Sequence, residues 1–292
     1  MKGNCVFSLV VGVYGHKKEF TRFLDSLYDQ SISFELIIVD QNPDDKISQM
    51  LESKYQALPW KHIKTGVKGL SHARNLGLEE SCGDYVCFPD DDCFFTSGFL
   101  DKVYDRLISC NPNGLAVITK DPETNKPLSY TKRNYDFFID TCDVFANITS
   151  ISVFLKNTDL RFDEKFGIGG EFNSCEEIDY VYRYVKIYGG FNYTPDICVY
   201  HPSPLKLPFA KLMNKVFVNS QGHGAFFIKN FNLRAYIEHI HLRPFAGFIY
   251  HLLRLDLKKS LISLISLVSR NYGSIRFFIS NIFGYDHAKS KF

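Results

Sequence analysis

The stretch "CVFSLVVGVYGHKKEFTRFLDSLYDQSISFELIIVD", residues 5–40, decides the fold. Residues 5–15 form a continuous apolar, β-branched run closed by glycines, which is typical of a strand buried on both faces. Residues 34–40 form a second such run, which ends in Asp40. Between the two runs, four apolar residues have helical spacing: Phe20, Phe23, Leu24 and Leu27. A strand, a helix and a strand in this order predict a βαβ unit with parallel strands.

The alternation of strand and helix continues to about residue 110. Further helices are expected around residues 47–55, 69–81 and 97–109, and further strands around residues 62–66 and 83–92. The sequence therefore predicts an α/β fold with a doubly wound, mostly parallel sheet and helices on both faces. The middle of the chain is more mixed, with strands expected at 147–157 and 191–204 and a helix at 174–190. Residues 206–292 have the pattern of amphipathic helices.

Composition and charge divide the chain in two. Of the 292 residues, 45% are hydrophobic and 15% aromatic, which permits a sizeable core and argues against disorder. Residues 1–205 contain 21 Lys and Arg against 29 Asp and Glu, a balance of −8, whereas residues 206–292 contain 13 against 3, a balance of +10. We therefore expect a domain at 1–205 followed by a basic, aromatic-rich helical region at 206–292. The acidic body argues against a nucleic-acid partner.

The cysteines and the apolar runs indicate the cellular compartment. No two of the eight cysteines have CxxC spacing, so we expect neither a disulfide framework nor a zinc site. Small buried thiols in a reducing cytosol are the simpler interpretation. The N-terminal apolar run is too short for a signal peptide, and no run approaches the ~20 apolar residues of a membrane span. The sequence predicts a cytoplasmic protein.

Three consecutive aspartates, Asp90, Asp91 and Asp92, follow the apolar run "YVCF". A single aspartate here would be interpreted as a solvated turn or a helix cap, but three in a row repel one another. A divalent cation relieves that repulsion, because Mg²⁺ and Mn²⁺ are held by carboxylates together with substrate phosphates. The carboxyl ends of parallel strands are also where such sheets bind ligands. We therefore expect Asp40 and the triplet to open onto one crevice that holds a diphosphate.

Two later features carry possible chemistry. Glu176 and Glu177 are adjacent at the start of the helix at 174–190 and follow a glycine-rich segment. Acidic residues are common at helix starts because of the dipole, but a carboxylate beside a glycine-rich loop could also be a general base. In the same helix, Asp179 and Arg183 are spaced to form an ion pair. His201 ends the last expected strand and could be a structural residue, a metal ligand or a phosphate contact.

Five stretches, taken together, resemble glycosyltransferase family 2 and, within it, bacterial enzymes of surface-polysaccharide assembly. They span about two hundred residues in the family's order: residues 8–14, 34–45, 68–93, 166–183 and 199–202. The resemblance implies a GT-A-like domain at 1–205 that binds a nucleotide-sugar. The Gly12–Gly15 segment departs from the family, because relatives often carry Pro and Asn there.

The resemblance also implies roles for individual residues. Six residues are implied to line the nucleotide pocket: Val13, Tyr14, Asp40, Gly69, Arg74 and Asn75. Asp90 and Asp92 match the family's metal motif, with Asp92 as the direct ligand and with Asp90 and Asp91 directed toward the ribose and the donor sugar. His201 matches a histidine that contacts metal or diphosphate.

The implied catalytic base is Glu177. Relatives usually have a Glu-Asp pair where this chain has Glu-Glu, so the choice between Glu176 and Glu177 stays open. The implied reaction is inverting transfer of a sugar, with Mn²⁺ or Mg²⁺, from a UDP-sugar as the expected donor. The acceptor would be a hydroxyl of a saccharide or of a polyprenyl-diphosphate-linked glycan. The resemblance places that chemistry in cell-surface polysaccharide synthesis, on the cytoplasmic face of the membrane.

Several alternatives stay open from the residues alone. The protein could be a non-catalytic nucleotide- or carbohydrate-binding protein with a transferase fold, although the full set of acidic residues argues against this. A nucleotidyltransferase would usually show a more basic, glycine-rich loop after the first strand. The region 206–292 could either pack on the catalytic domain or lie on the membrane as a peripheral anchor.

Overall fold

The computed structural model describes residues 5–16, 18–128, 134–203 and 207–282. The chain forms two compact units. The sheet unit comprises Met1–Asp163 and Glu177–Ser203, and the helical unit comprises Glu164–Glu176 and Pro204–Phe292. The predicted domain boundary between residues 205 and 206 lies outside the described residues. No sequence feature indicates that the loop at 164–176 belongs with the C-terminal helices.

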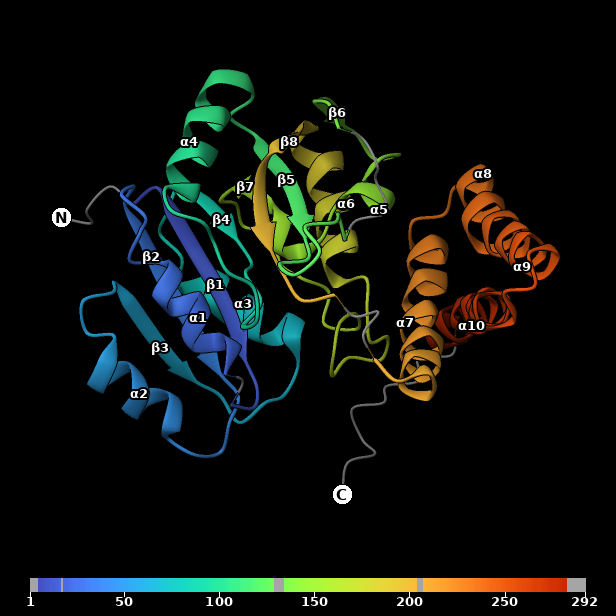
Figure 1. Ribbon diagram of the computed structural model, residues 1–292, viewed down its shortest axis with the longest axis horizontal. Coiled ribbons are helices and arrows are strands. Elements are labelled where there is room, and N and C mark those ends of the chain that lie inside the picture. Colours follow the sequence, from blue (N-terminus) through green and yellow to red (C-terminus); the bar gives the residue numbers. More distant parts are fainter. Residues whose placement is uncertain (1–4, 17, 129–133, 204–206, 283–292) are drawn as a thin grey trace. The chain divides into compact units, whose positions relative to one another are not determined.

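The sheet unit is built on one eight-stranded sheet in the order β3-β2-β1-β4-β7-β5-β8-β6 (Figure 1). The strands are β1 (Phe7–Val13), β2 (Phe34–Asp40), β3 (Trp60–Lys64), β4 (Tyr85–Cys87), β5 (Gly114–Lys120), β6 (Phe137–Ile139), β7 (Val153–Lys156) and β8 (Phe191–Tyr200). Only β7 and β6 run against the others. Strands β2, β4 and β8 therefore end at the same edge of the sheet, which is where ligands bind in such folds.

Helices cover both faces of this sheet. They are α1 (Glu19–Ser26), α2 (Lys46–Lys54), α3 (Leu70–Glu80), α4 (Phe99–Cys110), the short α5 (Val144–Asn147) and α6 (Glu176–Tyr188). Successive residues of β1 point to opposite faces of the sheet. Leu9 and Val11 belong to the core that includes α1, α2 and α4, whereas Val10 faces Gly77 of α3. This double burial explains the continuous apolar runs in the sequence.

The predicted fold class is confirmed, since the first four strands are parallel and alternate with helices. Strands β5 and β6 were not predicted. All eight cysteines are free thiols. The expectation of buried thiols holds for three of them, Cys87, Cys93 and Cys175, and is wrong for three exposed ones, Cys82, Cys110 and Cys142.

The described part of the helical unit outside its loop is helical throughout, as the sequence predicted. Its elements are α7 (Phe209–Lys229), α8 (Leu233–Tyr236), the π-helical turn η3 (Ile237–Leu242), α9 (Arg243–Leu253) and α10 (Leu257–Ile282). The loop at 164–176 packs within this unit. Phe166 and Phe172 contact Phe277 of α10, and the Ser174 hydroxyl donates a hydrogen bond of 2.6 Å to the Asn219 carbonyl of α7.

Candidate active site

Two strand ends bring the predicted metal ligands together. Strand β4 ends at Cys87 and β8 ends at Tyr200, and the two strands run in the same direction, so the residues that follow them meet at one edge. Phe94 and Tyr200 then exchange two backbone hydrogen bonds of 3.0 and 3.2 Å, and their rings stack. This pairing fixes the aspartate triplet beside His201.

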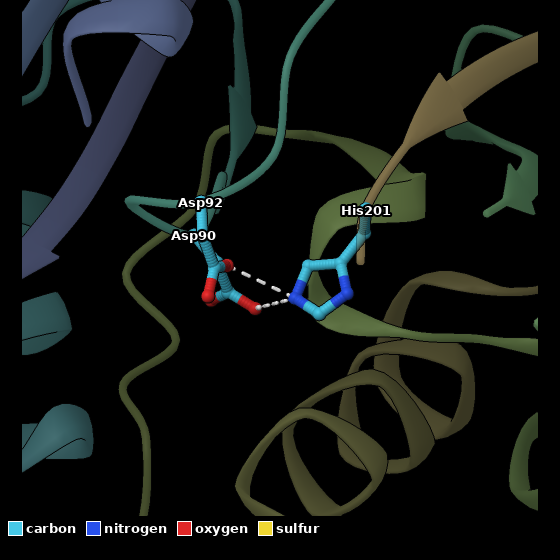
Figure 2. A group of neighbouring side chains, drawn as sticks. All are labelled: Asp90, Asp92 and His201. Atoms are coloured by element: carbon cyan, nitrogen blue, oxygen red, sulfur yellow. Dashed lines mark ion pairs between the residues drawn. The ribbon is translucent and has the colours of Figure 1, made fainter. Parts of the chain in front are cut away.

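Asp90, Asp92 and His201 form a compact cluster (Figure 2). The Nε2 atom of His201 lies 3.0 Å from Oδ1 of Asp92 and 3.9 Å from Oδ2 of Asp90. One ligand atom from each residue lies within 4.8 Å of the others. All three side chains are partly exposed, so solvent and ligands have access to the cluster.

Backbone contacts orient His201. Its Nδ1 atom lies 2.8 Å from the Pro202 carbonyl oxygen, which suits an Nδ1–H donor and turns Nε2 toward the aspartates. Burial disfavours the charged imidazolium, but the hydrogen bond to Asp92 and the charges of both aspartates outweigh it and raise the pKa of His201. Without a cation, the aspartates therefore favour a protonated His201.

Asp121 anchors the segment that carries His201. The His201 amide donates to the Lys120 carbonyl at 3.0 Å, and the Ser203 amide donates to Oδ2 of Asp121 at 2.9 Å. The Asp121 side chain is 1% exposed, and its Oδ1 accepts three hydrogen bonds from Glu123 and Thr124. The sequence analysis missed Asp121, because its role depends on β5 lying next to β8.

Arg74 holds the other side of the cluster. Its Nη2 lies 3.1 Å from Oδ1 of Asp90, and its guanidinium is 5.8 and 5.5 Å from the ring centroids of Phe88 and Phe162. Arg74 is 1% exposed, so this charge is almost wholly desolvated and depends on Asp90 and the two rings. Arg74 therefore orients Asp90 and leaves Oδ2 directed toward His201.

The donor set fits a divalent cation. Two carboxylates and one imidazole nitrogen offer the oxygen and nitrogen ligands that Mn²⁺ accepts, and they already lie within one coordination sphere. Asp91 contributes differently, since it is 6% exposed and lies in the turn closed by the Cys93 amide and the Asp90 carbonyl. Its predicted contact with the donor stays a prediction.

Asp40 lies at the end of β2, as expected, but it is fully buried. Its Oδ1 accepts hydrogen bonds from the amide and from the side chain of Asn42, at 2.9 and 2.8 Å, and its Oδ2 lies 3.3 Å from Nε2 of His62. Asn42 in turn accepts from the Gly15 amide at 2.7 Å. Asp40 thus shapes the turn that follows β2, and its predicted contact with a base stays a prediction.

Other predicted pocket residues lie around the same edge. Val13 is buried next to Asp40, and Tyr14 is 54% exposed and accepts a hydrogen bond of 2.7 Å from Lys68. The amide of Gly69, whose φ of +151° is left-handed, donates to Oε1 of Gln41 at 2.7 Å. Asn75 makes two hydrogen bonds to the Phe162 backbone, at 3.0 and 2.7 Å, so in this structure it fastens that segment.

Helix α6 begins with the two glutamates. Glu176 is 8% exposed and is assigned to the helical unit. Glu177 is only partly buried and is the first residue of α6 that is assigned to the sheet unit. Tyr180 stacks on Phe162 and meets Phe88 edge-on, with centroids 4.3 and 5.4 Å apart. Phe88 precedes Asp90 by two residues, so this turn of α6 packs behind the cluster of Asp90, Asp92 and His201.

The pair predicted within α6 is present, with Nε of Arg183 lying 2.8 Å from Oδ2 of Asp179. Arg183 also donates to the Arg161 carbonyl at 2.8 Å. The predicted ion pair is confirmed, and it ties α6 to the segment before the loop.

Five residues of the site were not singled out by the sequence analysis: Gln41, Asn42, His62, Lys68 and Asp121. The polar run "QNPDD" after β2 was a signal for the first two, because polar side chains at strand ends shape the ligand edge. His62 and Lys68 carry no local signal, since their contacts depend on the neighbouring strand and loop.

The chain is similar to one family of known proteins. The sequence profile of glycosyl transferase family 2 matches residues 8–170, more than half of the chain. The chain belongs to this family. The matched range includes the aspartate triplet, Asp40 and Arg74, whereas Glu177 and His201 lie beyond it.

Two curated relatives are similar to part of this chain. The chain is 32% identical over 121 residues to the poly(ribitol-phosphate) beta-N-acetylglucosaminyltransferase TarS of Staphylococcus aureus, which covers 37% of this chain and 21% of the relative. It is 30% identical over 121 residues to the minor teichoic acid biosynthesis protein GgaA of Bacillus subtilis, covering 39% and 27%. The alignments thus span about a fifth to a quarter of these relatives' length.

Solved structures confirm the fold. The structure of residues 1–349 of S. aureus TarS aligns with a TM-score of 0.57 at 18% identity and covers 92% of both chains. The mannosyltransferase PcManGT of Pyrobaculum calidifontis, in complex with GDP-Man and Mn²⁺, aligns with a TM-score of 0.63 at 15% identity and covers 98% and 89%. The predicted GT-A-like architecture is therefore confirmed.

Proposed function

We propose that the protein is an inverting glycosyltransferase that moves a sugar from a nucleotide-diphosphate sugar to an acceptor hydroxyl in cell-surface polysaccharide synthesis. The observation that carries the proposal is the Asp90, Asp92 and His201 cluster at the ligand-binding edge of the sheet. Family membership supports the reaction class. The relatives named for teichoic acid biosynthesis and for glycosylation of poly(ribitol-phosphate) support the pathway class.

The proposed mechanism uses residues of the sheet unit. Glu177 takes the proton of the acceptor hydroxyl, and the oxygen attacks the anomeric carbon from the face opposite the leaving diphosphate. We favour Glu177 over Glu176 because Glu177 is the more accessible carboxylate. Asp90, Asp92 and His201 would hold a divalent cation, which supplies positive charge at the diphosphate. Arg74 keeps Asp90 oriented throughout.

The proposed donor is a UDP-sugar. Support comes from TarS, whose structures were determined in complex with UDP and with UDP-GlcNAc. The structure of PcManGT with GDP-Man shows that the same fold also accepts guanosine, so the base is a matter for experiment. Asn42, His62 and Lys64 surround Asp40 and are the residues that would shape the base pocket.

The proposed acceptor is a saccharide hydroxyl, carried on a polyprenyl diphosphate at the inner leaflet of the cytoplasmic membrane. Among the described helices, none is long and apolar enough to cross a bilayer. We propose peripheral association through the basic C-terminal region, whose cations would meet anionic headgroups.

A thermal-shift panel tests the donor site. UDP-, GDP- and dTDP-sugars are added with and without Mn²⁺ to the wild type, to Asp92→Ala and to the matched control Asp105→Ala, which removes an exposed carboxylate of α4. We expect a UDP-sugar to stabilise the wild type and the control only with Mn²⁺, and Asp92→Ala to lose the effect. Absence of any shift in the wild type would favour a non-catalytic protein. A product with retained anomeric configuration, seen by NMR, would contradict the inverting mechanism.

A further inference from the structure

The helical unit packs its two longest helices through small residues. Ser220 and Gly224 of α7 face Ser266, Ser269 and Gly273 of α10. A Cβ atom at Gly224 would overlap the Arg270 carbonyl oxygen, and one at Gly273 would overlap the Gln221 carbonyl oxygen, so the two backbones touch. Serine hydroxyls bridge the helices, including a Ser220–Ser266 contact of 3.0 Å. Close packing of small residues with hydroxyl bridges is typical of helices in an apolar medium.

The opposite face of α10 presents large apolar residues to the outside. They recur at intervals of three and four along the whole helix, and we call them the α10 stripe: Leu257, Leu261, Leu264, Val268, Tyr272, Ile275, Ile279 and Ile282. Each is between 37% and 65% exposed. From Leu261 to Ile279 every exposed residue of α10 is apolar or aromatic. The helix therefore turns its small polar face inward and its apolar face outward.

Helix α9 and the turn into α10 continue this surface. Leu253 is 79% exposed and Leu255, in the turn, is 84% exposed. Phe245 and Ile249 of α9 lie about one turn apart and are also exposed. The apolar surface thus extends around the turn between the two helices.

An exposed apolar surface of this length is costly in water and calls for an apolar partner. The stripe runs along the side of a helix about 39 Å long, whose rise is 1.5 Å per residue over 26 residues. No described helix is suited to cross a bilayer, so the geometry favours a helix lying in the plane of a lipid surface.

The positive net charge of the helical unit favours an anionic lipid surface. Residues 207–282 contain 10 Lys and Arg against 2 Asp and Glu. Arg254 and Lys258, which are exposed, flank the apolar turn beside Leu255. Such an arrangement of exposed cations beside an apolar stripe complements anionic headgroups over an acyl boundary.

We propose that the α10 stripe and the α9–α10 turn are a docking surface for an anionic lipid bilayer, with the stripe inserted at the acyl boundary and Arg254 and Lys258 at the headgroups. The inference rests on the proposed membrane association of the enzyme and names the residues that would produce it. It also predicts an orientation, with α10 parallel to the membrane plane.

Vesicle co-sedimentation of the full chain tests this surface. The probes are phosphatidylcholine vesicles, alone or with about 30% phosphatidylglycerol. We expect wild type to bind the anionic vesicles and the double variant Val268→Gln and Ile275→Gln to bind about tenfold more weakly, because two apolar side chains no longer enter the boundary. The matched control, Ile108→Gln with Ile187→Gln, alters two equally exposed residues of the sheet unit and should bind like wild type.

A charge variant separates the two contributions. Arg254→Gln with Lys258→Gln should weaken binding to anionic vesicles about tenfold and should leave the weaker binding to neutral vesicles unchanged. If the stripe variant and the sheet-unit control lose vesicle binding to the same extent, the proposal is wrong. It is also wrong if the wild type binds neither kind of vesicle.

The donor-dependent thermal shift keeps this test independent of the proposed function. A stripe variant that loses vesicle binding but keeps the shift supports docking through the stripe. A wild type that shows the shift but ignores vesicles refutes docking and leaves the transferase proposal standing. Sedimentation velocity tests whether a second copy of the chain covers the stripe instead. If the wild type binds no vesicles but forms a dimer, and the stripe variant is a monomer, the stripe is a dimer interface.

Discussion

The two units of the chain use apolar residues in opposite ways. The sheet unit buries large side chains such as Phe7, Phe99 and Phe154 between sheet and helices. Where α7 crosses α10, the helical unit instead buries serine and glycine and leaves leucine and isoleucine outside. Hydrophobic burial in water accounts for the first arrangement, whereas the second requires either an apolar surrounding or very close packing.

The helical unit is not uniform, because its loop at 164–176 packs through large aromatic side chains. Phe166 and Phe172 of the loop at 164–176 contact Phe277 of α10, and Arg276 lies 3.8 Å from Glu171. The loop that ends at Glu176 is thus held by the buried side of the helix whose outer side carries the α10 stripe. One of the boundaries between the two units falls between Glu176 and Glu177.

The largest expected effect is on kcat and comes from Glu177, the residue that follows this boundary. Glu177→Gln removes the proposed base and should lower kcat by about 10²–10⁴ while the donor-induced thermal shift persists. The measurement is single-turnover transfer with saturating donor. Glu176→Gln is the matched control, and we expect a much smaller loss because Glu176 is buried in the loop. A greater loss for Glu176→Gln would move the base into the helical unit.

The next effect tests how closely α7 and α10 are packed. Gly224→Ala forces a methyl group against the Arg270 carbonyl and should lower the free energy of unfolding by about 1–3 kcal/mol. Urea denaturation measures this change. Gly66→Ala is the control, since nothing lies within 4 Å of a Cβ there, and its effect should stay within about 0.5 kcal/mol. Equal changes in the free energy of unfolding for the two variants would mean that α7 and α10 accommodate the methyl group without loss of stability.

The parallel half of the fold could be predicted because its strands are buried on both faces. Strands β1 and β2 give apolar runs that end in polar turns, and the direction of a βαβ unit follows from its order. The antiparallel β7 could not be read in this way, since nothing local in "VFLK" specifies the direction of a strand. Strand β5, "GLAVITK", lies in the mixed middle and was missed.

The site was predictable to the same extent. Asp90, Asp92 and His201 follow strands, so the rule for strand ends could place them. Arg74 was expected at the nucleotide, but the structure pairs it with Asp90 between two rings that come from distant segments. Asp121 carries no signal until β5 is known to pair with β8.

A smaller effect, on the affinity for Mn²⁺, is expected from a substitution of Asp121. Asp121→Asn weakens the contacts that hold the segment of Ser203 and His201, and we expect the affinity for Mn²⁺ to fall about tenfold, as is usual for residues that orient a ligand. Isothermal titration with Mn²⁺ measures it. Asp140→Asn is the control, because Asp140 also accepts a hydrogen bond from a backbone amide, that of Cys142, but follows the edge strand β6. An unchanged affinity in Asp121→Asn would show that β8 alone orients His201.

The smallest effect lies at the opposite edge of the sheet. Burial disfavours the Glu35 carboxylate, but hydrogen bonds from Ser8, Cys82 and Gly83 outweigh it and lower the pKa of Glu35. Because the folded pKa lies below the unfolded value, Glu35 stabilises the fold above the unfolded pKa, and this stability is lost as pH falls through the folded pKa.

Glu35→Gln should therefore cost about 1 kcal/mol at neutral pH and progressively less as the pH falls below the ordinary glutamate pKa. Urea midpoints measured from pH 7 down to the acid limit of the fold give the comparison with wild type. Glu19→Gln, at an exposed position of α1, is the control substitution. A constant difference between Glu35→Gln and wild type at every pH would mean that the three donors stabilise the turn without favouring the charged form. The sheet unit would then draw its acid sensitivity from other carboxylates.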